Sequence, residues 1–327
     1  MTSTHPYVLL TGAGFTNAVN AYLTMQIWEH AFNQPEVVQD DILRREMLNN
    51  RHDLNYEKLY DALRSKQGSG KSFQNYLIAL DRVFCQIDDI IRVSVVGENR
   101  SHLVSLALLH EWLFRFRGQN GAQGFIFTIN HDLFLERQLG KREGVPRLPG
   151  IADCGQPSCV SKTTTLVKIN VTKETTKEKI RSDLSAFNLI KLHGSSNWTY
   201  EDATTTMITG QRKDLEVPRH PLFDAYSKLF ADVLSNCKGQ LWVIGYGFGD
   251  KDINDAIVRG VKNGLSVYIA DLAIPKDLLN KIPSEVRPAV CGYIRNSLAG
   301  IFPRGEGSSI PLKEIESLMS NAGRSEA

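Results

Sequence analysis

The chain has 327 residues and a formal net charge of +2, from 38 Lys and Arg against 36 Asp and Glu. This near balance argues against a nucleic-acid-binding protein that depends on a strong overall positive field. Hydrophobic residues make up 42% and charged residues 23%, an ordinary globular composition. No run approaches the roughly 18 consecutive apolar residues of a membrane-spanning helix, so no membrane association is expected.

The first residues lack the charged and apolar stretches of a secretion signal, which predicts a cytoplasmic location. Five cysteines are scattered along the chain and odd in number, which fits free thiols in a reducing compartment. The only close pair, Cys154 and Cys159, has no second pair to complete a four-ligand zinc site. We therefore expect no bound metal.

The first predicted strand is the apolar, β-branched run at 7–11, which leads into Gly12-Ala13-Gly14. A strand that runs into glycines and then into a helical pattern is the opening of a nucleotide-binding α/β unit. The next segment, about 33–118, has apolar residues three and four positions apart and few breakers. It is therefore predicted to be a helical insertion.

Four further strands are predicted by apolar runs at 124–128, 189–192, 241–244 and 266–270. Helical patterns at 221–236 and 250–263 separate the last three of these strands. Strands that alternate with helices imply a parallel sheet with helices on both faces.

The sequence therefore predicts an α/β, Rossmann-like fold in one domain over residues 1–327. Its core is expected at about 1–32, 119–140 and 185–302, with a polar C-terminal tail at 303–327. Within that tail, Leu312, Ile315 and Leu318 form a weak helical pattern. The polar segments 141–187 and 199–220 are expected to be small excursions from the sheet.

Two motifs follow the first two strands. Gly12-Ala13-Gly14 would let a dinucleotide pyrophosphate approach the backbone, although a plain tight turn is an equally good interpretation. Thr128-Ile129-Asn130-His131-Asp132 places polar residues directly after a buried strand, so these residues should face a crevice. Asp132 would alternatively cap the next helix.

Three more candidates follow the later strands. His193-Gly194 offers a neutral imidazole as general base, against the alternative of a hydrogen-bonded structural histidine. The glycine-rich turn Gly245-Tyr246-Gly247-Phe248-Gly249-Asp250 would wrap a ribose or phosphate, with Asp250 capping the following helix. Asp271 would accept hydrogen bonds from ribose hydroxyls, or is a turn aspartate.

In their order and strand contexts, these motifs resemble the Sir2, or sirtuin-like, family over about residues 7 to 272. The resemblance implies a Sir2-like fold in which Asn130 and His193 are catalytic, with Asp132 beside them, and NAD is the substrate. The residues that it assigns to NAD binding are Gly12, Ala13, Gly14, Asn17, Thr128, Gly245, Tyr246, Gly247, Phe248 and Asp271.

The chain departs from deacylating sirtuins in having no pair of CxxC motifs, Ile129 in place of Gln, and Gly245-Tyr246-Gly247 in place of Gly-Thr-Ser. Its helical insertion is also longer. It looks more like the bacterial Sir2-like effectors of antiphage defence, which hydrolyse NAD and often act beside a second protein such as a HerA-family ATPase or a short Argonaute. This resemblance implies a homo-oligomer with a separately encoded activator.

Three functions follow as hypotheses. In an NAD glycohydrolase, Asn130 would orient water and the ribose hydroxyls, Asp132 would fix the loop or stabilise positive charge, and His193 would be the general base. The alternatives are an NAD-dependent protein deacylase that uses the same residues, and a non-catalytic module that senses NAD or ADP-ribose.

Overall fold

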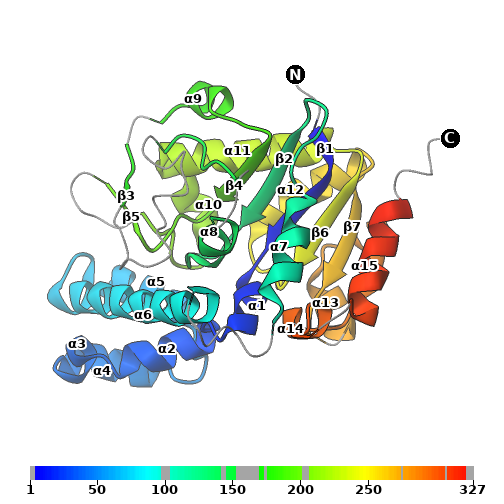
Figure 1. The fold of residues 1–327 in the computed structure, drawn as a ribbon. Coiled ribbons are helices and arrows are strands. Elements are labelled where there is room, and N and C mark those ends of the chain that lie inside the picture. The colour runs from blue at the N-terminus through cyan, green and yellow to red at the C-terminus, as the bar shows by residue number, and fades with distance from the viewer. Residues whose placement is uncertain are drawn as a thin grey trace.

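A computed structural model describes residues 4–96, 104–140, 145–151, 169–172, 175–200, 206–273, 275–305 and 308–321. Its centre is a six-stranded parallel sheet in the order β4-β2-β1-β6-β7-β8 (Figure 1). The strands are β1 (Thr4–Thr11), β2 (Gln123–Thr128), β4 (Phe187–Lys191), β6 (Gln240–Ile244), β7 (Ser266–Ala270) and β8 (Val290–Ile294). The predicted parallel α/β sheet is confirmed.

Four neighbouring strands, β4, β2, β1 and β6, end level with one another. Thr11 at the end of β1 pairs with Thr128 of β2 on one side and Ile244 of β6 on the other, and Thr128 pairs with Lys191 of β4. The strand order reverses between β1 and β6. Ligands of open α/β sheets bind in the crevice at such a reversal, beyond the carboxyl ends of the strands.

Helices cover both faces of the sheet, which is why β2, β4 and β6 are buried along almost their whole length. Figure 1 shows α7 in front of the sheet and α11 and α12 behind it. The helices that follow β1 or flank the sheet are α1 (Ala13–Thr16), α7 (Leu106–Phe114), α8 (Phe134–Leu139), α9 (Lys177–Ser182), α10 (Lys213–Glu216), α11 (Pro221–Asn236), α12 (Lys251–Lys262), α13 (Pro275–Lys281) and α14 (Leu298–Ile301).

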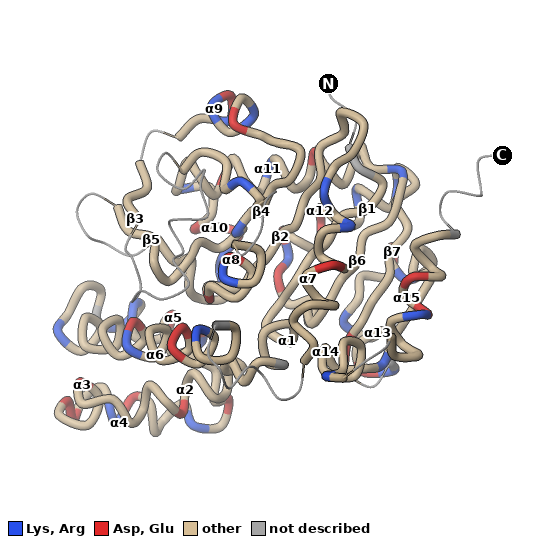
Figure 2. Tube along the Cα trace, viewed as in Figure 1, with Lys and Arg blue, Asp and Glu red and all other residues tan. Residues whose placement is uncertain are grey.

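A separate helical layer lies beyond the carboxyl edge of the sheet (Figure 1). It consists of α2 (Thr24–Phe32), α3 (Pro35–Val38), α4 (Asp41–Asn49), α5 (Tyr56–Gln67) and α6 (Lys71–Val96). The 26-residue α6 packs against the other four helices and against α8 of the core. Figure 2 shows acidic and basic positions on α5, α6 and α8, where this layer meets the sheet domain.

One of these charged contacts is buried. Arg137 of α8 and Asp88 of α6 form a two-point ion pair, with Nε–Oδ1 and Nη2–Oδ2 distances of 2.7 and 2.5 Å, and both side chains are at most 5% exposed. Such a pair holds α6 in a defined position against α8, because removing either partner would leave an uncompensated buried charge.

The structure differs from the sequence prediction at several elements. The helical pattern after Gly14 is interrupted: α1 is followed by the 3-10 turn η1 (Asn17–Val19) and by Asn20 at φ +62°, and α2 begins only at Thr24. The edge strand β8 and the small parallel pair β3 (Ile169–Asn170) and β5 (Trp198–Thr199) were not predicted.

The weak helical pattern near the end of the chain is confirmed as α15 (Ile310–Asn321). Leu312, Ile315 and Met319 of this helix are buried, and the Tyr7 hydroxyl donates to the Met319 carbonyl oxygen at 2.6 Å. The helix is therefore attached to the start of β1.

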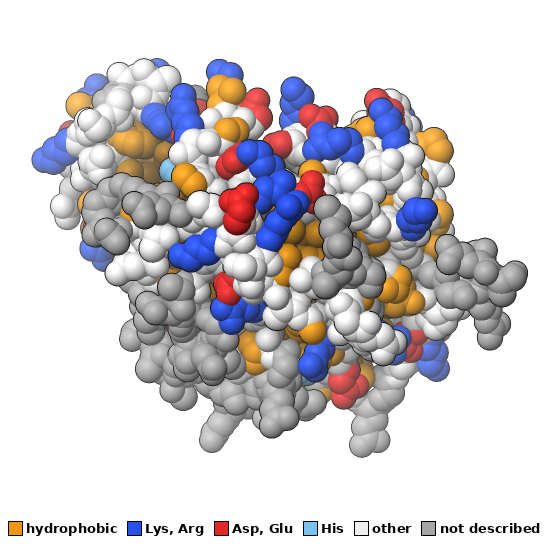
Figure 3. All heavy atoms as spheres, turned by 90° about the horizontal axis from the view of Figure 1, so that it is seen from above, with side chains coloured by type: hydrophobic (Ala, Val, Ile, Leu, Met, Phe, Trp, Pro, Cys, Tyr) orange, Lys and Arg blue, Asp and Glu red, His pale blue; other side chains and the backbone are white. Residues whose placement is uncertain are grey.

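None of the described helices is both long and apolar enough to cross a bilayer. Figure 3 shows the face of the molecule at the amino ends of the strands, where blue basic and red acidic side chains are interspersed.

Candidate functional site

The turns after β1 and β6 are packed directly against each other. Gly12 and Gly14 donate their backbone amides to the carbonyl oxygens of Ile244 and Gly245, both at 3.0 Å. A Cβ on Gly12 would lie 2.6 Å from the Gly245 oxygen, and Gly245 itself has φ +63°. These glycines are thus required by chain packing, and the amide of Gly14 is occupied by the protein. The tight-turn interpretation accounts for the spacing of Gly12 and Gly14.

Asn130 joins this turn to the end of β2. Its side-chain amide nitrogen donates to the Gly12 carbonyl oxygen at 3.0 Å and lies 3.4 Å from the Thr16 hydroxyl. Its backbone amide donates to the hydroxyl of Thr128, which is buried, at 3.1 Å. Three predicted site residues, Gly12, Thr128 and Asn130, are therefore brought together.

Asp132 is half-buried, and its Oδ1 accepts from the Phe134 backbone amide at 2.9 Å. This contact at the start of α8 is the one expected of a helix cap. Burial raises the pKa of the Asp132 carboxyl, although the charge of Lys191 and the hydrogen bonds from Phe134 and Thr16 oppose that rise.

A buried charged pair lies next to Asp132, and one of its members, Lys191, belongs to the strand predicted at 189–192. Lys191, the last residue of β4, pairs with Glu136 of α8 at 2.8 Å, and the two side chains are 1% and 4% exposed. The Lys191 ammonium also donates to the backbone carbonyl of Asp132. A lysine inside a predicted buried strand was the available signal, because such a charge needs a partner.

His193 follows β4 at the same edge and is 1% exposed. No well-formed hydrogen bond to either ring nitrogen is found among the described residues. Burial, and then the positive charge of Lys213, lower the pKa of His193 well below its usual value, while a backbone contact with Ile129 opposes this. The ring is therefore neutral at pH 7.

His131 is a second buried histidine, which the sequence analysis did not single out. Its ring centroid lies 6.5 Å from that of His193 and 5.7 Å, edge to face, from that of Phe84 on α6. Burial, followed by the charges of His193 and Lys213, lowers the pKa of His131 well below its usual value. The helical insertion thus covers His131 at the carboxyl edge of the sheet.

Lys213 is a further residue of this region that was not predicted from the sequence. Its ammonium lies 2.8 Å from a Glu57 oxygen on α5 and 3.0 Å from an Asp250 oxygen after β6. Asp250 was predicted to cap α12, but its side chain makes no capping bond and pairs with Lys213 instead. We call Glu57, Lys213 and Asp250 the ion triad. It links the insertion, α10 and the glycine-rich turn.

The remaining part of the glycine-rich turn is folded around Tyr246. The Tyr246 hydroxyl donates to the Asp250 carbonyl or to Asn254 at 3.2 Å and accepts from the Asp250 amide at 3.1 Å. Phe248 is buried and has φ +54°, a conformation that side chains rarely adopt. A Cβ added to Gly247 or Gly249 would meet nothing within 4 Å, so open space borders the backbone here.

The last two predicted residues lie at the margin of this group. Asp271 follows β7, and its Oδ1 accepts from the Ala273 amide at 2.7 Å, as in a turn aspartate. Asn17 opens η1, and its backbone carbonyl accepts from the Asn20 amide at 3.0 Å. No contact between either side chain and the other predicted site residues is seen in the described part of the chain.

No three or more His, Cys, Asp or Glu side chains of the described residues are grouped so as to hold a metal ion. Cys154 and Cys159 lie outside the described residues.

These residues form what we call the strand-end site: the turns after β1, β2, β4 and β6, covered by α5 and α6. It combines a neutral imidazole, an anchored amide side chain and a carboxyl group beside open backbone. Such a set can accept a proton and orient a polar substrate, and its glycine-rich backbone can pass close to a ligand.

Comparison with known proteins gives one family match, to the SIR2-like domain, over residues 124–267. The matched segment is less than half of the chain, but it contains Asn130, Asp132, His193 and the glycine-rich turn. No curated protein matches the chain.

Among solved structures, a mutant Sir2 homologue in complex with 2′-O-acetyl-ADP-ribose is 10% identical. The alignment covers 97% of this chain and 92% of that chain, with a TM-score of 0.44. A Sir2 complex with a p53 peptide and NAD+ is 13% identical, with 98% and 95% covered and a TM-score of 0.37. Nothing about the ligands of this chain follows from similarity at this level. The segment from β2 to β7, which carries most of the strand-end site, is thus similar to SIR2-like domains.

Proposed function

We propose that the chain is an NAD glycohydrolase, which converts NAD and water into nicotinamide and ADP-ribose. The observation that carries the proposal is the buried, neutral His193, which follows β4 at the carboxyl edge of the sheet, with its ring centroid 6.5 Å from that of His131 in the turn after β2. The similarity of residues 124–267 to SIR2-like domains supports NAD as the substrate.

The reaction breaks the bond between the ribose C1′ and the nicotinamide nitrogen, and the electron pair leaves with nicotinamide. Water adds to C1′, and its proton passes to a base. His193 is suited to accept that proton because burial keeps it neutral. Asn130 is suited to orient water or ribose hydroxyls through its amide oxygen, since the amide nitrogen is already held by Gly12. Asp132 holds the loop at Phe134 and stabilises developing positive charge.

Because α5 and α6 cover the strand-end site, its geometry supports hydrolysis by a single positioned water rather than by bulk water. Phe84 of α6 contacts the His131 ring, and the ion triad ties α5 to the glycine-rich turn. Exclusion of bulk water strengthens every electrostatic interaction within such a site.

The experiment is to incubate the full chain with NAD and to follow nicotinamide and ADP-ribose, with and without an acetylated peptide. The proposal requires equal amounts of both products and no dependence on peptide. Turnover only with peptide, accompanied by loss of its acetyl group, would instead identify a deacylase. Binding of NAD with no product would identify a sensing module.

We further propose that the chain self-associates and is controlled by a separately encoded activator such as a HerA-family ATPase, in antiphage defence. The insertion carries exposed apolar side chains at Val38, Ile42 and Ile78, which are 52%, 60% and 47% exposed. Exposed apolar side chains on a helical layer favour protein–protein contact. Light scattering across a concentration series tests this, with Ile42→Glu as the disrupting variant. A monomer with full turnover at every concentration would contradict it.

A further inference from the structure

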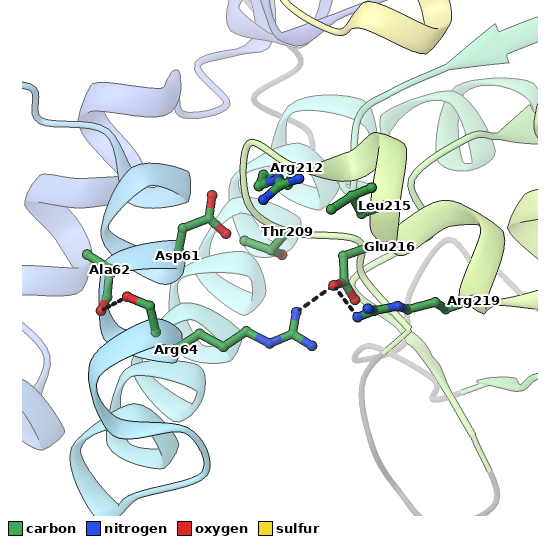
Figure 4. Close-up of a pocket in the computed structure, with 9 residues that line it drawn as sticks. Asp61, Ala62, Arg64, Thr209, Arg212, Leu215, Glu216 and Arg219 are labelled. Atoms are coloured by element: carbon green, nitrogen blue, oxygen red, sulfur yellow. Dashed lines mark hydrogen bonds and ion pairs between the residues drawn. The ribbon is translucent and has the colours of Figure 1, made fainter.

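A pocket lies where the insertion meets the segment before α11. It has a volume of roughly 510 Å³ and is lined by residues of α5 and of the segment 209–219. Figure 4 shows Asp61 and Arg64 reaching from α5 toward the side that carries Arg212, Glu216 and Arg219. Pockets of about 300–1,000 Å³ are typical of sites for small organic ligands.

The charges around this pocket favour an anion. Three arginines line it, against two carboxylates. Glu216 is shared between Arg64 at 3.2 Å and Arg219 at 2.9 Å, so one carboxylate serves two guanidinium groups. Asp61 accepts from the Gln211 backbone amide at 2.7 Å.

Arg212 is the third arginine of the pocket, beside Arg64 and Arg219. It is exposed, and no carboxylate pairs with it in the part of the chain that the structure describes. A guanidinium group binds phosphate oxygens at two points and also stacks on planar rings. Ala62 on α5 and Leu215 on the opposite side of the pocket, the latter 43% exposed, add apolar surface.

The pocket and the ion triad share the same two elements. Glu57 and Asp61 are one turn apart on α5, and Arg212 directly precedes Lys213. Arg212 faces the pocket, whereas Lys213 is buried and pairs with Glu57 and Asp250. A ligand that draws α5 and the segment 209–219 together would therefore act on the contact that holds the insertion over the strand-end site.

We propose that this pocket binds a nucleotide-sized organic phosphate, with its phosphate at Arg212 and its planar base against Leu215, and that binding fixes the insertion against the core. The binding itself does not depend on the NAD-hydrolysing function. A failure of ADP to bind at this pocket would therefore leave the proposed NAD hydrolysis untouched, and a failure of NAD hydrolysis would leave the proposed binding untouched.

Calorimetry with ADP tests the binding, with adenosine and inorganic pyrophosphate as partial probes. Arg212→Ala should weaken ADP binding about tenfold, the size of one lost charge-assisted hydrogen bond. Glu216→Gln should strengthen it severalfold, because Arg64 and Arg219 lose their carboxylate partner. Arg259→Ala on α12 and Glu111→Gln on α7 change the same charges elsewhere and should have no effect. Adenosine should not bind, and pyrophosphate should bind more weakly than ADP.

Hydrogen exchange locates the site on the full chain. ADP should slow amide exchange in 56–67 and 206–219, and Arg212→Ala should remove this protection at the same ADP concentration. The proposal is overturned if ADP does not bind, if ADP protects only the turns after β1 and β6, or if pyrophosphate binds as well as ADP.

Discussion

The side-chain amide nitrogen of Asn130 lies 3.0 Å from the carbonyl oxygen of Gly12, a residue 118 positions earlier in the chain. This hydrogen bond connects the turn after β2 to the turn after β1, and Gly12 in turn packs on Gly245 after β6. Three motifs that are far apart in sequence are therefore one structural unit.

Replacement of Asn130 by Ala should reduce NAD cleavage by at least about a hundredfold, because it removes the group proposed to orient water or ribose. The free energy of unfolding should fall by only about 1 kcal/mol, the usual value of a lost hydrogen bond. Asn263→Ala is the matched control, since Asn263 donates to the Ser235 carbonyl on the far helices at 3.2 Å. Equal turnover in the two variants would remove Asn130 from the mechanism.

Stability should fall as the pH is lowered from about 6.5 toward 5. The pKa values of His131 and His193 are depressed in the folded chain by burial and nearby positive charge, whereas the unfolded chain binds protons below its ordinary histidine pKa near 6.5. Each histidine can thus contribute up to about 1.4 kcal/mol of lost stability per pH unit. Above about pH 7 both histidines are neutral in the folded and in the unfolded chain, so their contribution to the free energy of unfolding no longer changes with pH.

Denaturant unfolding at a series of pH values measures this slope. His193→Gln should make the slope shallower, and His52→Gln, which changes an exposed histidine, should leave it unchanged. The raised pKa of Asp132 acts with the opposite sign at lower pH, because its folded carboxyl takes up a proton more readily than the unfolded one. An unchanged slope in His193→Gln would show that this ring is not held neutral.

Lys213→Met should destabilise the chain by about 3 kcal/mol, since it leaves the Glu57 and Asp250 carboxylates, 19% and 13% exposed, without their partner. The triple change Glu57→Gln, Lys213→Met and Asp250→Asn should recover part of that loss, because no unpaired charge remains. Chemical denaturation of both variants checks this. A triple variant less stable than Lys213→Met would show that the three charges do not act together.

Treatment with a chelator should change neither the melting temperature nor the turnover. The described residues include no cluster suited to a metal, and the sequence lacks a second cysteine pair near Cys154 and Cys159. Elemental analysis that found one tightly bound metal per chain, with unfolding upon its removal, would contradict this prediction.

The features predicted correctly from sequence are those that depend on neighbouring residues. The continuous apolar run 124–128 identified a buried strand, and the pattern at 221–236 matched α11 residue for residue. The edge strand β8 was missed because most of its residues are only partly buried, with Cys291 exposed, and because Gly292 interrupts its apolar run. A strand that is only partly buried carries a weaker apolar pattern.

Contacts between distant segments could not be predicted from sequence. Asp250 has the position of a helix cap. Its side chain instead pairs with the buried, oppositely charged Lys213, which lies 37 residues away in sequence. The glycines at 12 and 14 suggested phosphate binding, whereas their packing against Gly245 appears only once β1 and β6 are adjacent. His131 gave no signal of its own, since its burial depends on Phe84 from the insertion.

The most direct test of the account is the rate of nicotinamide release from NAD by the His193→Ala variant, with His52→Ala as control and the melting temperature of both recorded. The account predicts that His193→Ala stays folded and loses detectable release, while His52→Ala matches the unaltered chain. Release at the unaltered rate from a folded His193→Ala variant would contradict it.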